Sequence, residues 1–195
     1  MDGHYFDESP SSDDRRREVT AHIGGRELVF TTSGGVFSHD GLDKATDVLL
    51  RTRDLPGEGV VLDLGCGWGP IACTLAAAGA TVWAVDVNPR ALELTELNAE
   101  RLGVVVHTSL PDDVPDTLVV DQIWSNPPIR IGKQALHNLL LRWLPRLAPA
   151  GVARLVVGKN LGADSLQRWL IEQGWPTERV DSEKGFRILE VRRPQ

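Results

Sequence analysis

The sequence predicts an α/β fold in which a mostly parallel β-sheet carries helices on both of its faces. Short, continuously apolar runs, such as residues 59–65 and 81–87, alternate along the chain with amphipathic stretches of helical length. Strands without a polar side are buried on both faces, as they are in a parallel sheet covered by helices. The chain has 195 residues, 42% of them hydrophobic, which is enough for one core of this kind and too few for two.

The expected elements begin with an N-terminal addition to a single domain that spans residues 18–195. Residues 1–17 are polar and rich in Ser, Asp and Arg, so we expect a flexible arm. Residues 18–56 predict an extension, a β-hairpin broken at two glycine pairs and then a short helix at 43–53. The core covers residues 57–195. Its expected strands are 59–65, 81–87, 104–108, 119–125, 152–158 and an edge or antiparallel strand at 186–193, and its expected helices are 70–78, 89–102, 134–147 and 163–173.

Composition narrows the class of protein. No run approaches the roughly eighteen consecutive apolar residues of a membrane span, and the N-terminal residues lack the apolar centre of a signal peptide. We therefore expect a cytoplasmic protein with no membrane partner. Cys66 and Cys73 fit neither a disulfide framework nor zinc-ligand spacing, and His39 and His107 have no partner ligands at suitable spacing, so we expect no metal.

Charge is distributed unevenly along the chain. The formal net charge of -6 argues against a protein whose whole surface binds a polyanion. From residue 131 to the end, however, there are 11 basic and 6 acidic residues, whereas residues 1–130 hold 10 basic and 21 acidic ones. A nucleic acid would therefore meet the C-terminal third, unless its basic residues are scattered over several faces and are simply solvated.

A glycine-rich loop, DLGCGWGP at residues 63–70, joins the first buried strand to the next helix. Glycines let the backbone turn sharply and approach a ligand closely, and amides exposed at a helix start attract electron-rich groups. Asp86 ends the next buried strand 21 residues after Gly65, a spacing at which a carboxylate meets ribose hydroxyls. A dinucleotide and an aminoacyl sulfonium such as S-adenosylmethionine both remain open. Asp63 would repel a diphosphate and attract an ammonium group, which favours S-adenosylmethionine.

The sequence Asn126-Pro127-Pro128-Ile129 directly follows the strand expected at 119–125. Two prolines fix φ and remove two backbone donors, so the stretch offers carbonyl acceptors, with the side-chain carbonyl of Asn126 beside them. In isolation such a sequence marks only a turn. At the carboxyl edge of this sheet, Asn126 Oδ1 and the Pro127 carbonyl suit the two protons of an exocyclic amino group, whose nitrogen lone pair then points at a methyl donor.

In this order, the segments DLGCGWG, VDVNPRAL and NPPI resemble the class I S-adenosylmethionine-dependent methyltransferases. Within them they are similar to the small subfamily that includes the guanine-N2 methyltransferases of small-subunit ribosomal RNA and their short archaeal and bacterial relatives. The similarity extends to GGVFSHDGLDKAT and VVGKNLGADSL, and so covers nearly the whole chain after about residue 25. It implies a Rossmann-like, seven-stranded sheet with a reversed last hairpin, S-adenosylmethionine as cofactor, and guanine N2 of ribosomal RNA as the acceptor.

The motifs and the resemblance together give a set of expected site residues. Asn126 and Pro127 are the expected catalytic pair. The expected cofactor contacts are Asp63, Gly65, Cys66, Gly67, Gly69, Asp86, Val87, Ser109 and Asn126, and the expected substrate contacts are Phe37, Ser38, Pro128, Ile129, Arg130 and Lys133. Two positions depart from the family's pattern: Ser109 stands where an acid often binds the adenine amino group, and Ile129 where an aromatic residue often stacks on the acceptor base.

Alternatives remain open at the level of sequence. The same Asn-Pro-Pro arrangement suits a protein glutamine amide, an adenine amine or a small-molecule amine. A non-catalytic partner domain that binds the cofactor would keep the same fold, whereas a dinucleotide oxidoreductase would have no use for Asn126. Phe37 contacts substrate or plugs the core, and Trp68 packs on the cofactor, in the core or beneath a lid.

Overall fold

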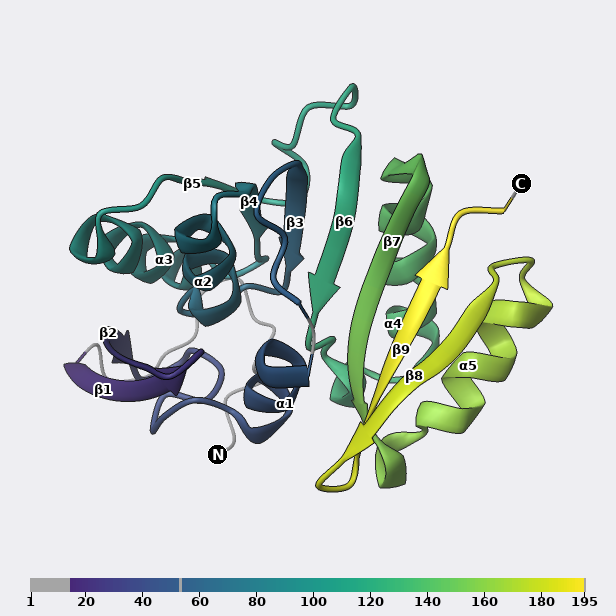
Figure 1. Cartoon of the computed structure of the whole chain (residues 1–195), viewed down its shortest axis with the longest axis horizontal. Coiled ribbons are helices and arrows are strands. Elements are labelled where there is room, and N and C mark those ends of the chain that lie inside the picture. The colour runs from purple at the N-terminus through teal and green to yellow at the C-terminus, as the bar shows by residue number, and fades with distance from the viewer. Residues whose placement is uncertain (1–14, 53, 195) are drawn as a thin grey trace.

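The structure is a computed structural model that describes residues 15–52 and 54–194. A seven-stranded sheet in the order β5-β4-β3-β6-β7-β9-β8 lies beside a separate two-stranded hairpin (Figure 1). The strands are β1 (Arg16–Ile23), β2 (Arg26–Ser33), β3 (Val60–Leu64), β4 (Thr81–Val85), β5 (Val106–Ser109), β6 (Val120–Ser125), β7 (Leu147–Gly158), β8 (Thr177–Glu183) and β9 (Phe186–Arg192). The helices are α1 (Lys44–Thr52), α2 (Pro70–Ala78), α3 (Pro89–Leu102), α4 (Lys133–Trp143) and α5 (Ala163–Glu172), with short 3₁₀ turns η1 (Ile129–Ile131), η2 (Leu144–Arg146) and η3 (Lys159–Leu161).

The sheet confirms the predicted fold class. The pairs β3/β4, β3/β6, β4/β5 and β6/β7 are parallel, and only the last hairpin is reversed, because β9 pairs antiparallel with both β7 and β8. The terminal strand is therefore antiparallel but does not form the sheet edge. That edge is β8, whose sequence TERVDSE has almost no apolar pattern and is exposed or half-buried except at Thr177. A strand with one solvated edge needs few apolar residues, which is why no periodicity marked it.

Helices cover both faces of the sheet, as predicted. Adjacent strand residues point to opposite sides: Val61 packs in the cluster with α1, α2 and α3, whereas Leu62 packs in the cluster with α4 and α5. Figure 1 shows the first three helices and the hairpin on one side of the sheet and the last two helices on the other. No helix among the described residues is long and apolar enough to span a membrane.

Most element boundaries differ from the prediction by one or two residues, but β7 begins at Leu147 rather than at residue 152, and the helix before it is shorter than expected. The helix expected at 134–147 ends at Trp143, and Pro145 lies in η2 before β7 begins. Proline has no N–H to continue the helical hydrogen bonds, so Pro145 ends the helix earlier than expected. The arm predicted at 1–17 falls mostly outside the described residues, although Arg16 and Arg17 already belong to β1, where they pair with Ser33 and Thr32.

The N-terminal hairpin contacts the core through hydrogen bonds to one buried side chain and through an aromatic pair. Asn98 of α3 is fully buried; its Oδ1 accepts from Thr31 N at 2.6 Å, and its Nδ2 donates to Thr31 O and to Trp68 O, each at 2.8 Å. Phe30 of β2 packs edge-to-face on Trp68, with ring centroids 5.0 Å apart. The hairpin is therefore in direct contact with the glycine-rich loop.

Candidate active site

Three adjacent parallel strands bring the predicted motifs to one edge of the sheet. The glycine-rich loop follows β3, Asp86 follows β4, and Asn126 follows β6, so all three lie at the carboxyl ends where open α/β sheets bind ligands. A pocket at this edge is lined by Phe37, Ser38, Asp43, Thr46, Gly65, Cys66, Gly67, Trp68, Pro70, Ile71 and Asn126. Five of the predicted site residues besides Asn126 therefore line one pocket with it.

Glycine is required in the loop for two different reasons. Gly65, Gly67 and Gly69 have φ of 77°, 58° and 87°, which side chains other than glycine rarely adopt. A Cβ on Gly69 would lie 2.9 Å from the side chain of Thr95, so that position is closed by packing. A Cβ on Gly65 or Gly67 would meet no atom within 4 Å among the described residues. The first two glycines therefore keep open the space in front of the loop.

The first three amides of this loop are hydrogen-bonded within the fold. The amides of Gly65 and Cys66 donate to Val85 O at 2.8 and 3.2 Å, and Gly67 N donates to Asp86 Oδ2 at 2.9 Å. These three amide groups therefore hold the loop against the end of β4 and are not available to a ligand. At these three positions the loop contributes shape and room to the pocket rather than free donors.

Asp63 lies behind the loop and is fully buried. Its Oδ2 accepts from Ala72 N at 2.9 Å near the start of α2, whereas Oδ1 has no hydrogen-bond partner within the described part of the chain. Burial raises the pKa of Asp63 to about 8, and the charge of Asp86 acts in the same direction, while the bond from Ala72 opposes it. A buried carboxyl oxygen without a partner suits the ammonium group of a ligand.

Asp86 is held with both carboxyl oxygens engaged. Oδ1 accepts from Asn88 N at 3.0 Å and Oδ2 from Gly67 N at 2.9 Å, and each oxygen retains a lone pair for a ligand hydroxyl. Burial raises the pKa of Asp86, and these amide donors work against that rise. Asn88 caps α3 by accepting from Arg90 N, and it also donates to Gly35 O at 3.0 Å.

The Asn126 side chain is oriented from α1. Its Nδ2 donates to Asp43 Oδ2 at 2.9 Å and to Thr46 Oγ1 at 3.2 Å, which leaves Oδ1 as the acceptor of the pair. The Pro127 carbonyl accepts from Ile129 N at 2.8 Å and keeps its second lone pair. Asp43 and Thr46 were not among the predicted contacts. The resemblance placed Asp43, with Phe37 and Ser38, in the segment that closes over cofactor and substrate in the family, but it did not indicate a contact with Asn126.

A loop between the hairpin and α1 covers the pocket. Phe37 is 43% exposed and lines the pocket, which is consistent with a substrate contact. Ser38 has a φ of 56°; its hydroxyl donates to Gly41 O at 2.6 Å, and its carbonyl accepts from Trp68 Nε1 at 3.3 Å. Trp68 is only 1% exposed, so it is a core residue that also supports this loop.

The remaining predicted residues are not part of the pocket lining. Ser109 ends β5, nearly buried, with its hydroxyl donating to Leu110 O at 2.9 Å. Val87 is 38% exposed beside Asp86. The predicted residues that follow Asn126 along the same edge are Pro128, Ile129, Arg130 and Lys133. Arg130 and Lys133 are exposed, as is Lys159 after the neighbouring strand β7. Among the described residues, no cluster of three or more metal-ligating side chains occurs.

Comparison with known proteins places this architecture in a family. Residues 27–190 match the family described as the methyltransferase small domain. YbxB from Bacillus subtilis strain 168, described as an uncharacterized protein, is 32% identical over 200 residues, which cover 99% of this chain and 100% of YbxB. Ribosomal RNA small subunit methyltransferase C from Idiomarina loihiensis is 32% identical over 160 residues, which cover 79% of this chain and 48% of that protein.

A solved structure has the same fold. It is the T. thermophilus 16S rRNA N2 G1207 methyltransferase RsmC in complex with AdoMet and guanosine, with a TM-score of 0.78 and 24% identity over 95% of this chain and 52% of that one. The chain thus spans about half the length of this protein and of the Idiomarina methyltransferase. By the family match and the Bacillus relative, the chain belongs to the methyltransferase small domain family, within the S-adenosylmethionine-dependent methyltransferases that its motifs indicated.

Proposed function

We propose that the chain transfers the methyl group of S-adenosylmethionine to an exocyclic amino group, N2 of a guanine in small-subunit ribosomal RNA. The observation that carries this proposal is the fixed Asn126 amide beside the open glycine-rich loop. The relatives named ribosomal RNA small subunit methyltransferase C support the choice of acceptor. A cytoplasmic location, where ribosomal RNA is found in bacteria, belongs to the same proposal.

The residues present fit S-adenosylmethionine as cofactor. The unpartnered Oδ1 of Asp63 suits the ammonium group, the space left by Gly65 and Gly67 accommodates a ligand against the loop, and Asp86 has lone pairs for ribose hydroxyls. Ser109 can still accept a hydrogen bond from an adenine amino group, since its hydroxyl proton is engaged elsewhere. When bound, the cofactor supplies an electrophilic methyl group on a sulfonium.

Catalysis in this scheme depends on orientation. Asn126 Oδ1 and the second lone pair of the Pro127 carbonyl accept the two protons of the acceptor amine, so its nitrogen lone pair faces the methyl group. Pro127 and Pro128 have no N–H, which keeps competing donors away from the amine. The product nitrogen loses a proton to water, and no dedicated general base is needed.

The RNA itself would be held at the same edge. Arg130, Lys133 and Lys159 are exposed cations suited to phosphate contacts, which position a nucleic acid without reading its sequence. Phe37, partly exposed in the pocket lining, is suited to stack on the acceptor base in the absence of an aromatic residue at Ile129.

Two measurements test the proposal in order. Calorimetric titration with S-adenosylmethionine, its demethylated product and NADH should give micromolar binding of the adenosyl ligands alone, weakened at least tenfold by Asp86→Ala. Methyl transfer to unmodified small-subunit ribosomal RNA should then fall by on the order of 100-fold or more in Asn126→Ala. Failure to bind either adenosyl ligand would leave a degenerate partner domain as the better account.

The acceptor screen should include the alternatives. A glutamine-containing peptide, an adenine-containing RNA and free guanosine share the amine or amide chemistry that Asn126 and Pro127 suit. Preferential methylation of one of these over ribosomal RNA would keep the methyltransferase and refute the proposed acceptor.

A further inference from the structure

We propose that Asp43, assisted by Thr46, is a positioning residue that fixes which end of the Asn126 amide faces the acceptor. The inference rests on the proposed role of Asn126. It concerns a contact between residues 83 positions apart in the chain, which joins the start of α1 to the end of β6.

The chemistry of the two partners makes the orientation unambiguous. A carboxylate oxygen can only accept hydrogen bonds, and of the two ends of the amide only Nδ2 can donate. With Nδ2 at 2.9 Å from Asp43 Oδ2 and 3.2 Å from Thr46 Oγ1, both amide protons are directed at α1. A rotation of the amide by 180° would bring Oδ1 against the carboxylate and would offer the acceptor amine two donors in place of an acceptor. Asp43 thus selects the productive orientation.

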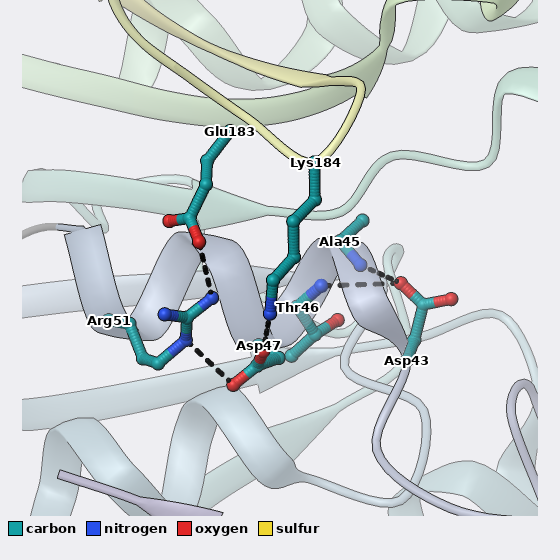
Figure 2. Close-up of polar contacts among 7 residues, drawn as sticks. All are labelled: Asp43, Ala45, Thr46, Asp47, Arg51, Glu183 and Lys184. Carbon is teal, nitrogen blue, oxygen red and sulfur yellow. Dashed lines mark hydrogen bonds and ion pairs between the residues drawn. The ribbon is translucent and has the colours of Figure 1, made fainter.

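Asp43 is itself held in a fixed position. Figure 2 shows its carboxylate at the start of α1, where Oδ2 accepts from Ala45 N at 2.7 Å and from Thr46 N at 3.2 Å. This is the geometry of a helix N-cap, which fixes the side chain by satisfying otherwise unpaired helix amides. The same oxygen therefore serves the helix and Asn126 at once.

The helix that carries Asp43 is anchored to the far end of the sheet. Arg51 pairs with Asp47 at 3.1 Å and with Glu183 at 3.0 Å, and Lys184 lies 3.8 Å from Asp47 (Figure 2). On its inner side α1 buries Val48 completely. Since Asn126 and the β8–β9 turn belong to one sheet, α1 is fixed to the same rigid body that carries its target.

The competing account is that Asp43 only caps α1. Three substitutions separate the two roles. Asp43→Ser keeps a good N-cap but is too short to reach Asn126, Asp43→Asn keeps an acceptor oxygen at the same reach, and Thr46→Val removes one acceptor with little change of shape.

The test measures methyl transfer to unmodified small-subunit ribosomal RNA in single turnover, together with S-adenosylmethionine affinity and melting temperature. For Asp43→Ser we expect the rate to fall 10- to 100-fold while cofactor affinity stays within about twofold, with recovery of most of the rate in Asp43→Asn and a loss of a few fold in Thr46→Val. In an Asn126→Ala background, Asp43→Ser should cause no further loss, because the residue it orients is gone. A cap alone would give additive losses.

A second readout does not depend on the acceptor. In the ¹⁵N spectrum of the whole protein, the side-chain NH2 of Asn126, identified by its loss in Asn126→Ala, should exchange with solvent at least tenfold faster in Asp43→Ser than in the wild type. Equal exchange in both proteins, or a wild-type transfer rate in Asp43→Ser, would overturn the inference. Full transfer activity in Asn126→Ala would instead overturn the proposed function and leave the exchange result to judge Asp43 alone.

Discussion

The loops after β3 and β6 lie side by side at one edge of the sheet, but they contribute different things to the site. Their strands are hydrogen-bonded neighbours, and Ser125 Oγ donates to Leu64 O at 2.6 Å just before both loops begin. The first loop is made of glycines at positive φ, with its amides turned inward, and leaves space. The second is made of prolines and leaves acceptors. The glycine-rich loop provides space for a ligand, and the proline loop provides hydrogen-bond acceptors. Substitutions should therefore affect the two loops in different ways.

The largest effects should come from adding one methyl group at two glycines of the first loop. Gly69→Ala places its Cβ 2.9 Å from Thr95 and should lower the free energy of unfolding by about 1–3 kcal/mol. Gly65→Ala is also strained by its positive φ, but it puts its Cβ in open space, so besides a smaller loss of stability it should weaken S-adenosylmethionine binding on the order of 10–100-fold by occupying ligand volume. Chemical unfolding and calorimetry measure the two. Similar behaviour of both variants would mean that the loop acts only as a tight turn.

The buried acid beneath the glycine-rich loop should make stability depend on pH. In the unfolded chain Asp63 loses its proton near its ordinary pKa of 3.8, whereas in the fold it keeps the proton to about 8. Between these values the folded state binds more protons, so the free energy of unfolding should fall as pH rises and level off above pH 8. Urea unfolding between pH 5 and 8.5 measures this fall, which Asp63→Asn should reduce. Asp86, whose pKa is also raised, should maintain a remainder. A pH profile unchanged in Asp63→Asn would show that the acid is not held neutral.

A smaller effect is expected where the first loop meets the segment that covers the pocket. Trp68→Phe keeps a ring against Phe30 but removes the N–H that bonds to Ser38 O. The loss of one hydrogen bond of about 1 kcal/mol should raise the KM for RNA by roughly fivefold and leave cofactor affinity unchanged. Steady-state kinetics with the two substrates varied separately measures it. A change confined to cofactor binding would assign the indole to the glycine-rich loop alone.

The smallest effects should appear beyond the proline loop. Lys133→Ala and Arg130→Ala should each weaken RNA binding modestly, whatever the RNA sequence, and lower the salt dependence of binding by about one phosphate contact. Filter binding between low and moderate salt measures the slope, with exposed Arg26 at the start of β2 as a matched control site. Slopes equal to the wild type in both variants would exclude this edge as the RNA surface.

The sequence predicted what local patterns and strand order determine. Continuous apolar strands predicted a parallel sheet, and the glycine-rich loop, Asp86 and Asn126 could be expected at one edge because parallel strands end together. What it did not reveal depends on contacts between distant segments. The bond from Asn126 to Asp43 spans 83 residues, and the inward use of the loop amides depends on β4. The residues of β8 did not predict a strand, because an edge strand lacks the apolar run that marks the other strands.

The hydrogen bonds of Asn98 link the N-terminal hairpin to the candidate site, although the hairpin is separate from the seven-stranded sheet. Removing β1 and β2 would remove the ring of Phe30 that packs on Trp68. Asn98 would keep only one of its three hydrogen bonds, the one from Nδ2 to Trp68 O in the glycine-rich loop. Because Val19, Ile23 and Phe30 belong to the same apolar cluster as that loop, the hairpin should unfold together with the site rather than before it. Limited proteolysis at Gly24-Gly25 would then be slowed by an adenosyl ligand bound on the other side of Trp68, so a cut far from the pocket would report whether the pocket is filled.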